Sequence, residues 1–220
     1  MRKQHWIAGA AFAAVMGAAS LAQAATSLTL DLTVADPAAG FGAPAKDGYG
    51  TVTITDLAGG KLGFDITLDD GASFNVNNNS QHHAFTFDLK GAGVTISSLT
   101  TGFSVNTGGP FAQDPFGKDW QHAISYTGAA KQGKAGSSLS FVVDDTLHDL
   151  TTASLQLGDI YGGKKIYASA DIFQNKATGN VGATMTTGVP EPATWAMMLV
   201  GFGGLGVAMR RARRQRALTA

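Results

Sequence analysis

Apolar and polar residues alternate through most of the middle of this chain, and this pattern restricts the folds open to it. Leu28, Leu30, Leu32 and Val34 form the first alternating run. Further runs lie at residues 52–54, 62–68, 85–89, 94–96, 120–126, 139–143, 155–157, 166–173 and 181–185. A period of two places one face of a β-strand in a core and the other in water. The pattern therefore predicts strands, and the same region shows no convincing helical periodicity.

Turn signals separate these runs, and together they predict an all-β domain over residues 25–186. The signals are Gly59-Gly60, Asp70-Gly71, Gly91-Ala92-Gly93, Gly108-Gly109-Pro110 and Gly162-Gly163. Nine to eleven short strands at this spacing favour two packed antiparallel sheets, as in a β-sandwich or jelly roll. A β-solenoid is the competing architecture, but the sequence has no fixed repeat period.

Charge is distributed unevenly along the chain. Residues 25–189 contain nine lysines, fifteen aspartates, no arginine and no glutamate, which gives this segment a net charge of −6. An acidic surface disfavours nucleic acid as a partner. The chain has no cysteine, so disulfides, thiol nucleophiles and thiolate metal sites are excluded, and about 165 residues are enough to bury a core without such cross-links.

The N-terminus has the features of a secretory signal peptide over residues 1–24. Arg2 and Lys3 precede an alanine-rich apolar stretch, and the segment ends in Ala22-Gln23-Ala24. Small residues at these two alanine positions predict cleavage before Ala25 by a signal peptidase after passage through the export translocon. An N-terminal membrane helix is the alternative, which the small-residue site disfavours.

The C-terminus combines a helix breaker, an apolar segment and a basic end. Residues 187–192 form a linker that contains Pro190, Glu191 and Pro192, and the prolines prevent a helix from starting earlier. Residues 193–209 carry no charge and predict a single transmembrane helix of about 26 Å, near the short limit for a bilayer. Trp195 suits the outer interface. The tail at 210–220 contains Arg210, Arg211, Arg213, Arg214 and Arg216, and predicts a cytoplasmic end.

Together, the Pro190-Glu191-Pro192 motif, Trp195 with Ala196, the glycine-rich apolar run and the arginine cluster resemble the PEP-CTERM sorting signal in its PEPxxWA variant. The resemblance implies a Gram-negative bacterial protein that an exosortase recognises. It implies cleavage near the Pro-Glu-Pro motif and release from an inner-membrane intermediate to the cell surface or an exopolysaccharide matrix. The preceding region resembles the all-β passenger domains often found ahead of this signal. An ordinary C-terminal membrane anchor is the alternative.

Four histidines remain after the predicted processing, and their spacing does not match a known metal or catalytic motif. His82 and His83 are adjacent and would point to opposite faces of a strand, with His83 on the apolar face and His82 exposed. His122 shares a face with Ile124, and His148 follows Asp144 and Asp145 in a loop. We expect structural or exposed roles for them, with no catalytic residue, metal ligand or cofactor.

A structural calcium site is the alternative to this expectation, because aspartates occur in pairs where the predicted strands end. The pairs are Asp69-Asp70 and Asp144-Asp145, with Asp149 nearby. Oxygen clusters of this kind can hold structural calcium outside the cytoplasm, but no EF-hand spacing is present. Solvated turn residues are the favoured explanation of the pairs.

The segment from Gly108 to Trp120 is a proline- and glycine-containing loop with three large aromatic residues. Phe111, Phe116 and Trp120 could stack on a sugar ring while neighbouring polar groups bind its hydroxyls. Alternatively, the three rings fold back and cover one end of the domain.

These observations give two hypotheses for function. The first is a non-enzymatic surface or extracellular-matrix protein with a structural, adhesive or exopolysaccharide-associated role. The second is a secreted hydrolase or lyase acting on polysaccharide, with histidines and aspartates gathered in a cleft. Convergence of those side chains in a pocket would favour the second hypothesis.

Overall fold

A computed structural model describes residues 26–41, 48–69, 71–76, 82–128, 135–186 and 202. The predicted signal peptide, the Pro-Glu-Pro linker, the basic tail and all of the predicted transmembrane helix except Phe202 lie outside these residues. Within the described part of the chain, no helix has the length and apolarity needed to cross a membrane.

The domain is built almost entirely from β-strands. The long strands are β1 (Ser27–Ala35), β2 (Gly50–Leu57), β3 (Lys61–Leu68), β8 (His122–Tyr126), β9 (Ser138–Asp144), β12 (Ala168–Gln174) and β13 (Ala177–Met185). The short strands are β4 (Ser73–Phe74), β5 (Phe85–Phe87), β6 (Thr95–Ser97), β7 (Phe103–Val105), β10 (Asp159–Tyr161) and β11 (Lys164–Ile166). A single 3₁₀ turn, η1, spans Thr152–Ser154.

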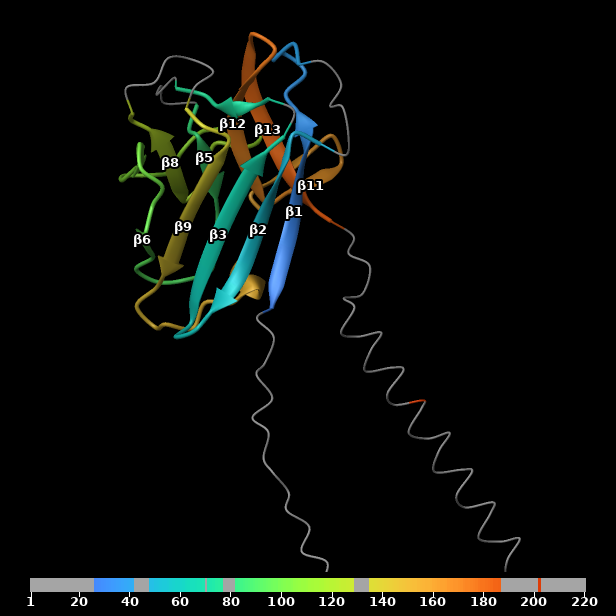
Figure 1. Cartoon of the computed structure of the whole chain (residues 1–220). Coiled ribbons are helices and arrows are strands. Elements are labelled where there is room, and N and C mark those ends of the chain that lie inside the picture. Colours follow the sequence, from blue (N-terminus) through green and yellow to red (C-terminus); the bar gives the residue numbers. More distant parts are fainter. Residues whose placement is uncertain are drawn as a thin grey trace, which may run out of the picture.

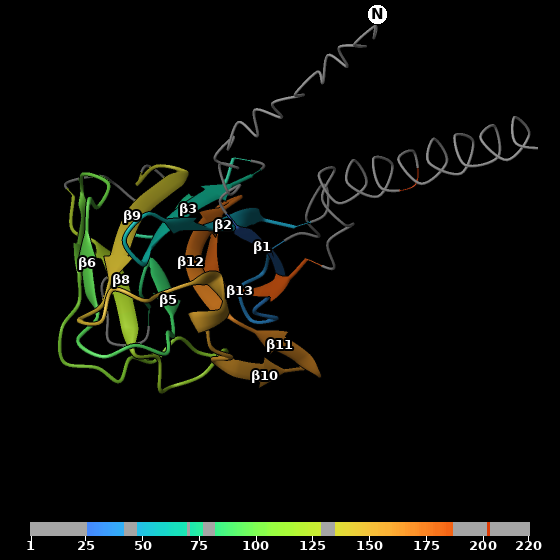
Figure 2. The same ribbon diagram turned by 90° about the horizontal axis from the view of Figure 1, so that it is seen from below.

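Eleven strands form one continuous sheet in the order β6-β9-β3-β2-β1-β13-β12-β5-β8-β7, with β4 paired to β12. Every pairing in the sheet is antiparallel. The end view shows the sheet curving round until β3 and β9 face β5 and β12 (Figures 1 and 2). The all-β antiparallel prediction is confirmed. The division into two separate sheets is wrong, because one sheet folds over and supplies both faces of the core.

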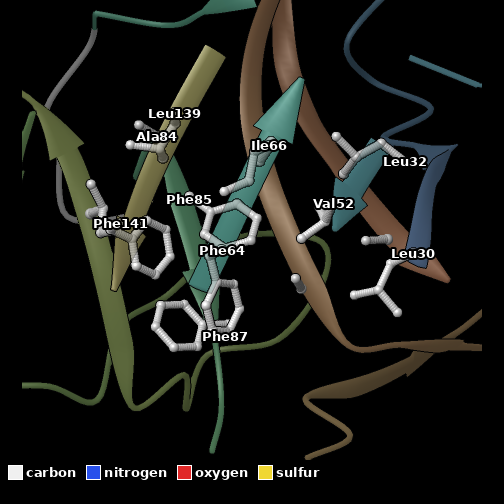
Figure 3. Packing of buried hydrophobic residues seen from close by; sticks show 14 of the residues in the cluster. Leu30, Leu32, Val52, Phe64, Ile66, Ala84, Phe85, Phe87, Leu139 and Phe141 are labelled. Atoms are coloured by element: carbon white, nitrogen blue, oxygen red, sulfur yellow. The ribbon is translucent and has the colours of Figure 1, made fainter. Parts of the chain in front are cut away.

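The main core lies inside this curve. Phe64 of β3 stacks on Phe141 of β9 with ring centroids 4.8 Å apart, and Phe87 of β5 lies 4.9 Å from Phe64 (Figure 3). Phe85 completes the aromatic group at 5.8 Å from Phe87. Tilted and offset rings at these distances are favourable arrangements for aromatic pairs. The inward residues are those that the alternating pattern assigned to the core, including Leu30, Leu32, Val52 and Ile66.

The predicted strand at residues 155–157 does not form. Leu155 makes one isolated bridge to Leu89 at the end of η1, and the chain then enters β10. The run predicted over residues 166–173 is divided at Tyr167, so that Ile166 ends β11 while Ala168 begins β12. β10 and β11 form a separate two-stranded sheet, which projects beside β13 in the end view (Figure 2).

Candidate functional site

The loop of residues 106–121, here called the strap, packs against β1, β11 and β13. Its Phe116 and Trp120 pack with Val34 of β1 and Ile166 of β11 in a second, smaller apolar cluster. Trp120 is 1% exposed, and its indole N–H donates to the Phe116 carbonyl at 2.8 Å. Gly182 of β13 allows this approach, because an added Cβ would lie 3.3 Å from the Phe116 ring.

This burial is inconsistent with the predicted sugar-stacking role of Phe116 and Trp120. Neither ring has a face open to solvent, because both serve as the apolar attachment of the strap. Phe111 is partly exposed, and its ring edge meets the His83 ring at 5.2 Å between centroids. The three aromatic residues therefore follow the alternative expectation, in which the loop folds back onto the domain.

Gln113 is the polar centre of the strap and is 0% exposed. Its side-chain oxygen accepts the His83 backbone N–H at 2.9 Å, and its amide nitrogen donates to the His83 carbonyl at 2.8 Å. The same nitrogen donates to the Asn180 side-chain oxygen at 2.9 Å, and Asn180 in turn donates to the Asp114 carbonyl. Gln113 thus joins the strap to the His83 backbone and to β13.

A histidine–aspartate pair lies where the chain re-enters the described region after residue 81. Nδ1 of His82 is 3.4 Å from Oδ2 of Asp171, and the Asn75 amide donates to the same oxygen at 2.8 Å. Asp171 is 1% exposed, and its Oδ1 has no hydrogen-bond partner in the described part of the chain. Hydrogen bonding to Asp171 is the main reason that the pKa of His82 is raised; burial opposes it, and the charges of Asp171, Asp36 and Asp114 add to it.

His83 is held by a second set of polar contacts. The Asn106 side-chain nitrogen lies 2.7 Å from Nδ1 of His83 and donates to the Ser125 hydroxyl at 2.9 Å. That hydroxyl is itself 3.2 Å from Nδ1 of His83. Burial, and then the neighbouring His82, lowers the pKa of the His83 imidazole. These contacts favour a neutral ring, with Nδ1 accepting the Asn106 hydrogen bond.

The remaining histidines lie elsewhere. His122 pairs with Phe87 in the sheet, with ring centroids 5.1 Å apart, and burial lowers its pKa. His148 contacts Asp144 at 2.7 Å, and Lys61 binds the same carboxylate at 3.0 Å. Both contacts lower the pKa of Asp144, and the contact with His148 has the larger effect. The structure therefore brings His82 and His83 together with Asp171, but leaves His122 and His148 at separate places.

Sequence reasoning did not identify Gln113, Asn106, Ser125, Asn180 or Asp171 as parts of one network. Asp171 offered the clearest signal, because it is a carboxylate in the middle of a strand otherwise rich in small and apolar residues. Asn106, Gln113 and Ser125 lie within 19 positions of one another, but Asn180 is 67 positions from Gln113, and only the folded sheet brings it to the other three.

Few chemical roles are open to the histidine–aspartate pair and its neighbours. Asp171 can orient the imidazole of His82, which is about one third exposed, and a histidine held in this way can accept or donate a proton. His83 and Gln113 are buried, and Gln113 bonds the His83 backbone to the strap. Among the described residues, no group of three or more histidine, aspartate or glutamate side chains is placed to hold a metal ion.

The C-terminal segment provides the evidence for identity. Residues 188–214 match the family model described as the PEP-CTERM protein-sorting motif. The chain carries this sorting motif at its C-terminal end. Comparisons with the curated proteins and with the solved structures found no match. The motif implies that the protein is exported, that an exosortase is its processing partner, and that it is sorted to the cell surface by way of the membrane.

Proposed function

We propose that this chain is a non-enzymatic component of the cell surface or extracellular matrix, with a structural or adhesive role in association with exopolysaccharide. The observation that carries the proposal is the sorting motif at residues 188–214. The motif follows an acidic β-domain in the sequence, and a signal-peptide-like segment precedes that domain. In this account an exosortase cuts the precursor near the Pro-Glu-Pro motif, and the β-domain is the part retained outside the cell.

The non-enzymatic reading is supported by how the polar residues are used. The side-chain amide of Gln113 bonds the His83 backbone, and Asn106 holds the His83 ring. Such contacts fix one conformation of the strap on β13. They are typical of a structural hydrogen-bond network.

Replacing Pro190, Glu191 and Pro192 together by alanine tests the sorting part of the proposal. If the exosortase reads this motif, the variant accumulates as a full-length membrane-bound species and the surface fraction loses the protein. A variant with alanine at Thr186 and Thr187 serves as the control next to the motif. Equal surface amounts of wild type and triple variant would contradict the proposal.

One observation favours the second candidate, a secreted hydrolase or lyase. The His82–Asp171 pair combines a buried carboxylate with a partly exposed imidazole, which is the geometry of an oriented general base. Soluble-sugar release from the exopolysaccharide of the producing bacterium provides the assay. Activity that is lost in His82→Gln, with folding retained, would replace the non-enzymatic proposal by the enzymatic one.

A further inference from the structure

A polar cavity lies at the end of the domain opposite the tip of the β12–β13 hairpin, between two loops. One loop contains residues 90–92, between β5 and β6, and the other consists of residues 145–154, which follow β9 and include η1. The cavity has a volume of about 520 Å³. This volume lies within the range of sites for small molecules.

Hydrogen bonds hold the two loops together on both sides of the opening. At one side the Lys90 N–H donates to the Ser154 carbonyl at 2.8 Å. At the other side the Thr146 N–H and its hydroxyl both donate to the Ala92 carbonyl, at 3.0 and 2.9 Å. Gly91 lies between these two connections and has no side chain to fill the space. The two loops are therefore joined on both sides of the cavity.

Asp145 lines this cavity with an unsatisfied group. Its side chain is 3% exposed, and Oδ2 has no hydrogen-bond partner among the described residues. A Cβ added to Gly91 would lie 3.4 Å from this oxygen, so Oδ2 lies directly beside the glycine. A buried carboxylate oxygen without a donor is costly, and a ligand that donates a hydrogen bond beside Gly91 would remove that cost.

The other lining groups indicate what kind of ligand fits. Lys90 and Asp149 bring opposite charges to the rim, and Thr151 and Ser154 add hydroxyls. This mixture does not favour a simple anion or a simple cation. Leu147 also lines the cavity and is 68% exposed, which offers an apolar surface for the C–H face of a ring. A neutral molecule that has hydroxyl groups and an apolar face matches all of these features.

We infer that this cavity binds a neutral, hydroxyl-rich ring of monosaccharide size, with one ligand hydroxyl donating to Asp145 beside Gly91. Leu147 covers the C–H face of the ring, and Lys90 donates to a second oxygen. A slight outward shift of residues 90–92 admits the donor to the covered Oδ2. The site is separate from the strap, and it deepens the proposed association with exopolysaccharide by naming where a sugar unit would bind.

Saturation-transfer NMR on the full chain tests this inference, in a detergent without a sugar headgroup. The probes are glucose, galactose, mannose and N-acetylglucosamine, each titrated into the millimolar range. We expect saturable binding of at least one of them. Asp145→Asn should weaken it by about tenfold because it removes the charged acceptor of the ligand hydroxyl, and Leu147→Ala should weaken it by a similar factor because it removes the apolar surface beneath the ring. Leu157→Ala, an exposed leucine outside the cavity, should leave it unchanged.

Gly91→Ala gives an independent check, because its added methyl group would lie 3.2–3.4 Å from Leu150, Val94 and Oδ2 of Asp145 and would occupy the space beside that oxygen. This variant should lose binding while keeping the thermal midpoint within a few degrees of wild type. Absence of binding by all four sugars would overturn the inference. Wild-type affinity in the Asp145 and Leu147 variants would also overturn it. So would calcium binding that Asp145→Asn abolishes. None of these results bears on sorting, which the Pro-Glu-Pro variant tests separately.

Discussion

At the scale of single residues, the structure depends on polar side chains that the alternating pattern could not assign. Gln113 lies in a loop, where an exposed polar residue is the ordinary expectation. It is instead buried, because the strap crosses the sheet and this side-chain amide bonds both the N–H and the carbonyl of His83. Sequence reasoning predicted a loop with aromatic residues correctly, but it could not tell which polar residue the loop would bury.

Replacing Gln113 by alanine should destabilise the domain by about 3 kcal/mol, since it removes hydrogen bonds to buried polar groups and leaves their partners unsatisfied. Urea denaturation followed by tryptophan fluorescence measures the change, because Trp120 lies in the same strap. Gln121→Ala is the matched control, since that side chain is exposed. A Gln113 variant as stable as the control would show that the strap is held by its aromatic residues alone.

The pKa shifts of three histidines predict that the free energy of unfolding is largest near pH 6.5, the ordinary pKa of histidine. The raised pKa of His82 stabilises the fold below that pH, and this contribution is lost as the pH rises through the folded-state pKa. The lowered pKa values of His83 and His122 act in the opposite direction. Their unfolded forms take up protons below about pH 6.5, so stability falls as the pH falls towards their folded-state values.

Urea midpoints measured from pH 5 to pH 8 test this sign argument. His82→Gln should remove the decline on the alkaline side and leave the acidic side unchanged. His122→Gln should reduce the decline on the acidic side only. A midpoint that His82→Gln changes equally at pH 5.5 and pH 8 would mean that the contact with Asp171 has no titrating component.

At the scale of elements, the long strands and the short strands β5 and β6 followed from the sequence, but β4, β7 and β10 did not. Alternation over residues 62–68 marked β3 because four apolar residues occupy one face. β4 and β7 have two and three residues, which is too short for a period to be recognised. The division between β11 and β12 was missed because apolar and small residues continue through Tyr167. Pattern alone does not indicate where a strand changes its partner.

The turn of the β12–β13 hairpin contains a conformational strain that one substitution can remove. Its two-residue turn places Asn175 and Lys176 at φ values of 51° and 69°. A turn with two positive φ values favours Asn-Gly, because glycine has no Cβ to oppose the left-handed conformation. Lys176→Gly should therefore stabilise the domain by about 1 kcal/mol, seen as a higher urea midpoint. Lys176→Ala, which keeps a Cβ, should bring no gain, and an equal gain from both variants would exclude this explanation.

At the scale of the whole molecule, the sequence predicted the class of fold but not the continuity of its sheet. Inward-facing residues of two sheets and of one strongly curved sheet alternate identically along each strand. The difference lies in which edges pair, and the pairing of β1 with both β2 and β13 joins the two halves. Those contacts join residues up to 155 positions apart, as in the register of Leu30 with Met185, and no local pattern specifies them.

The β-domain and the sorting segment also differ in how strongly sequence identifies them. The segment at residues 188–214 is recognised by its order of motif, apolar run and arginines, which does not depend on folding. The sites of the β-domain depend on tertiary contacts, so the strap network and the Asp145 cavity emerged only from the structure.

Intact-mass spectrometry of the protein recovered from the cell surface tests the central claim most directly. The account predicts a polypeptide that begins at Ala25 and ends near Pro190–Pro192, without residues 193–220. A surface protein that still ends at Ala220 would contradict it.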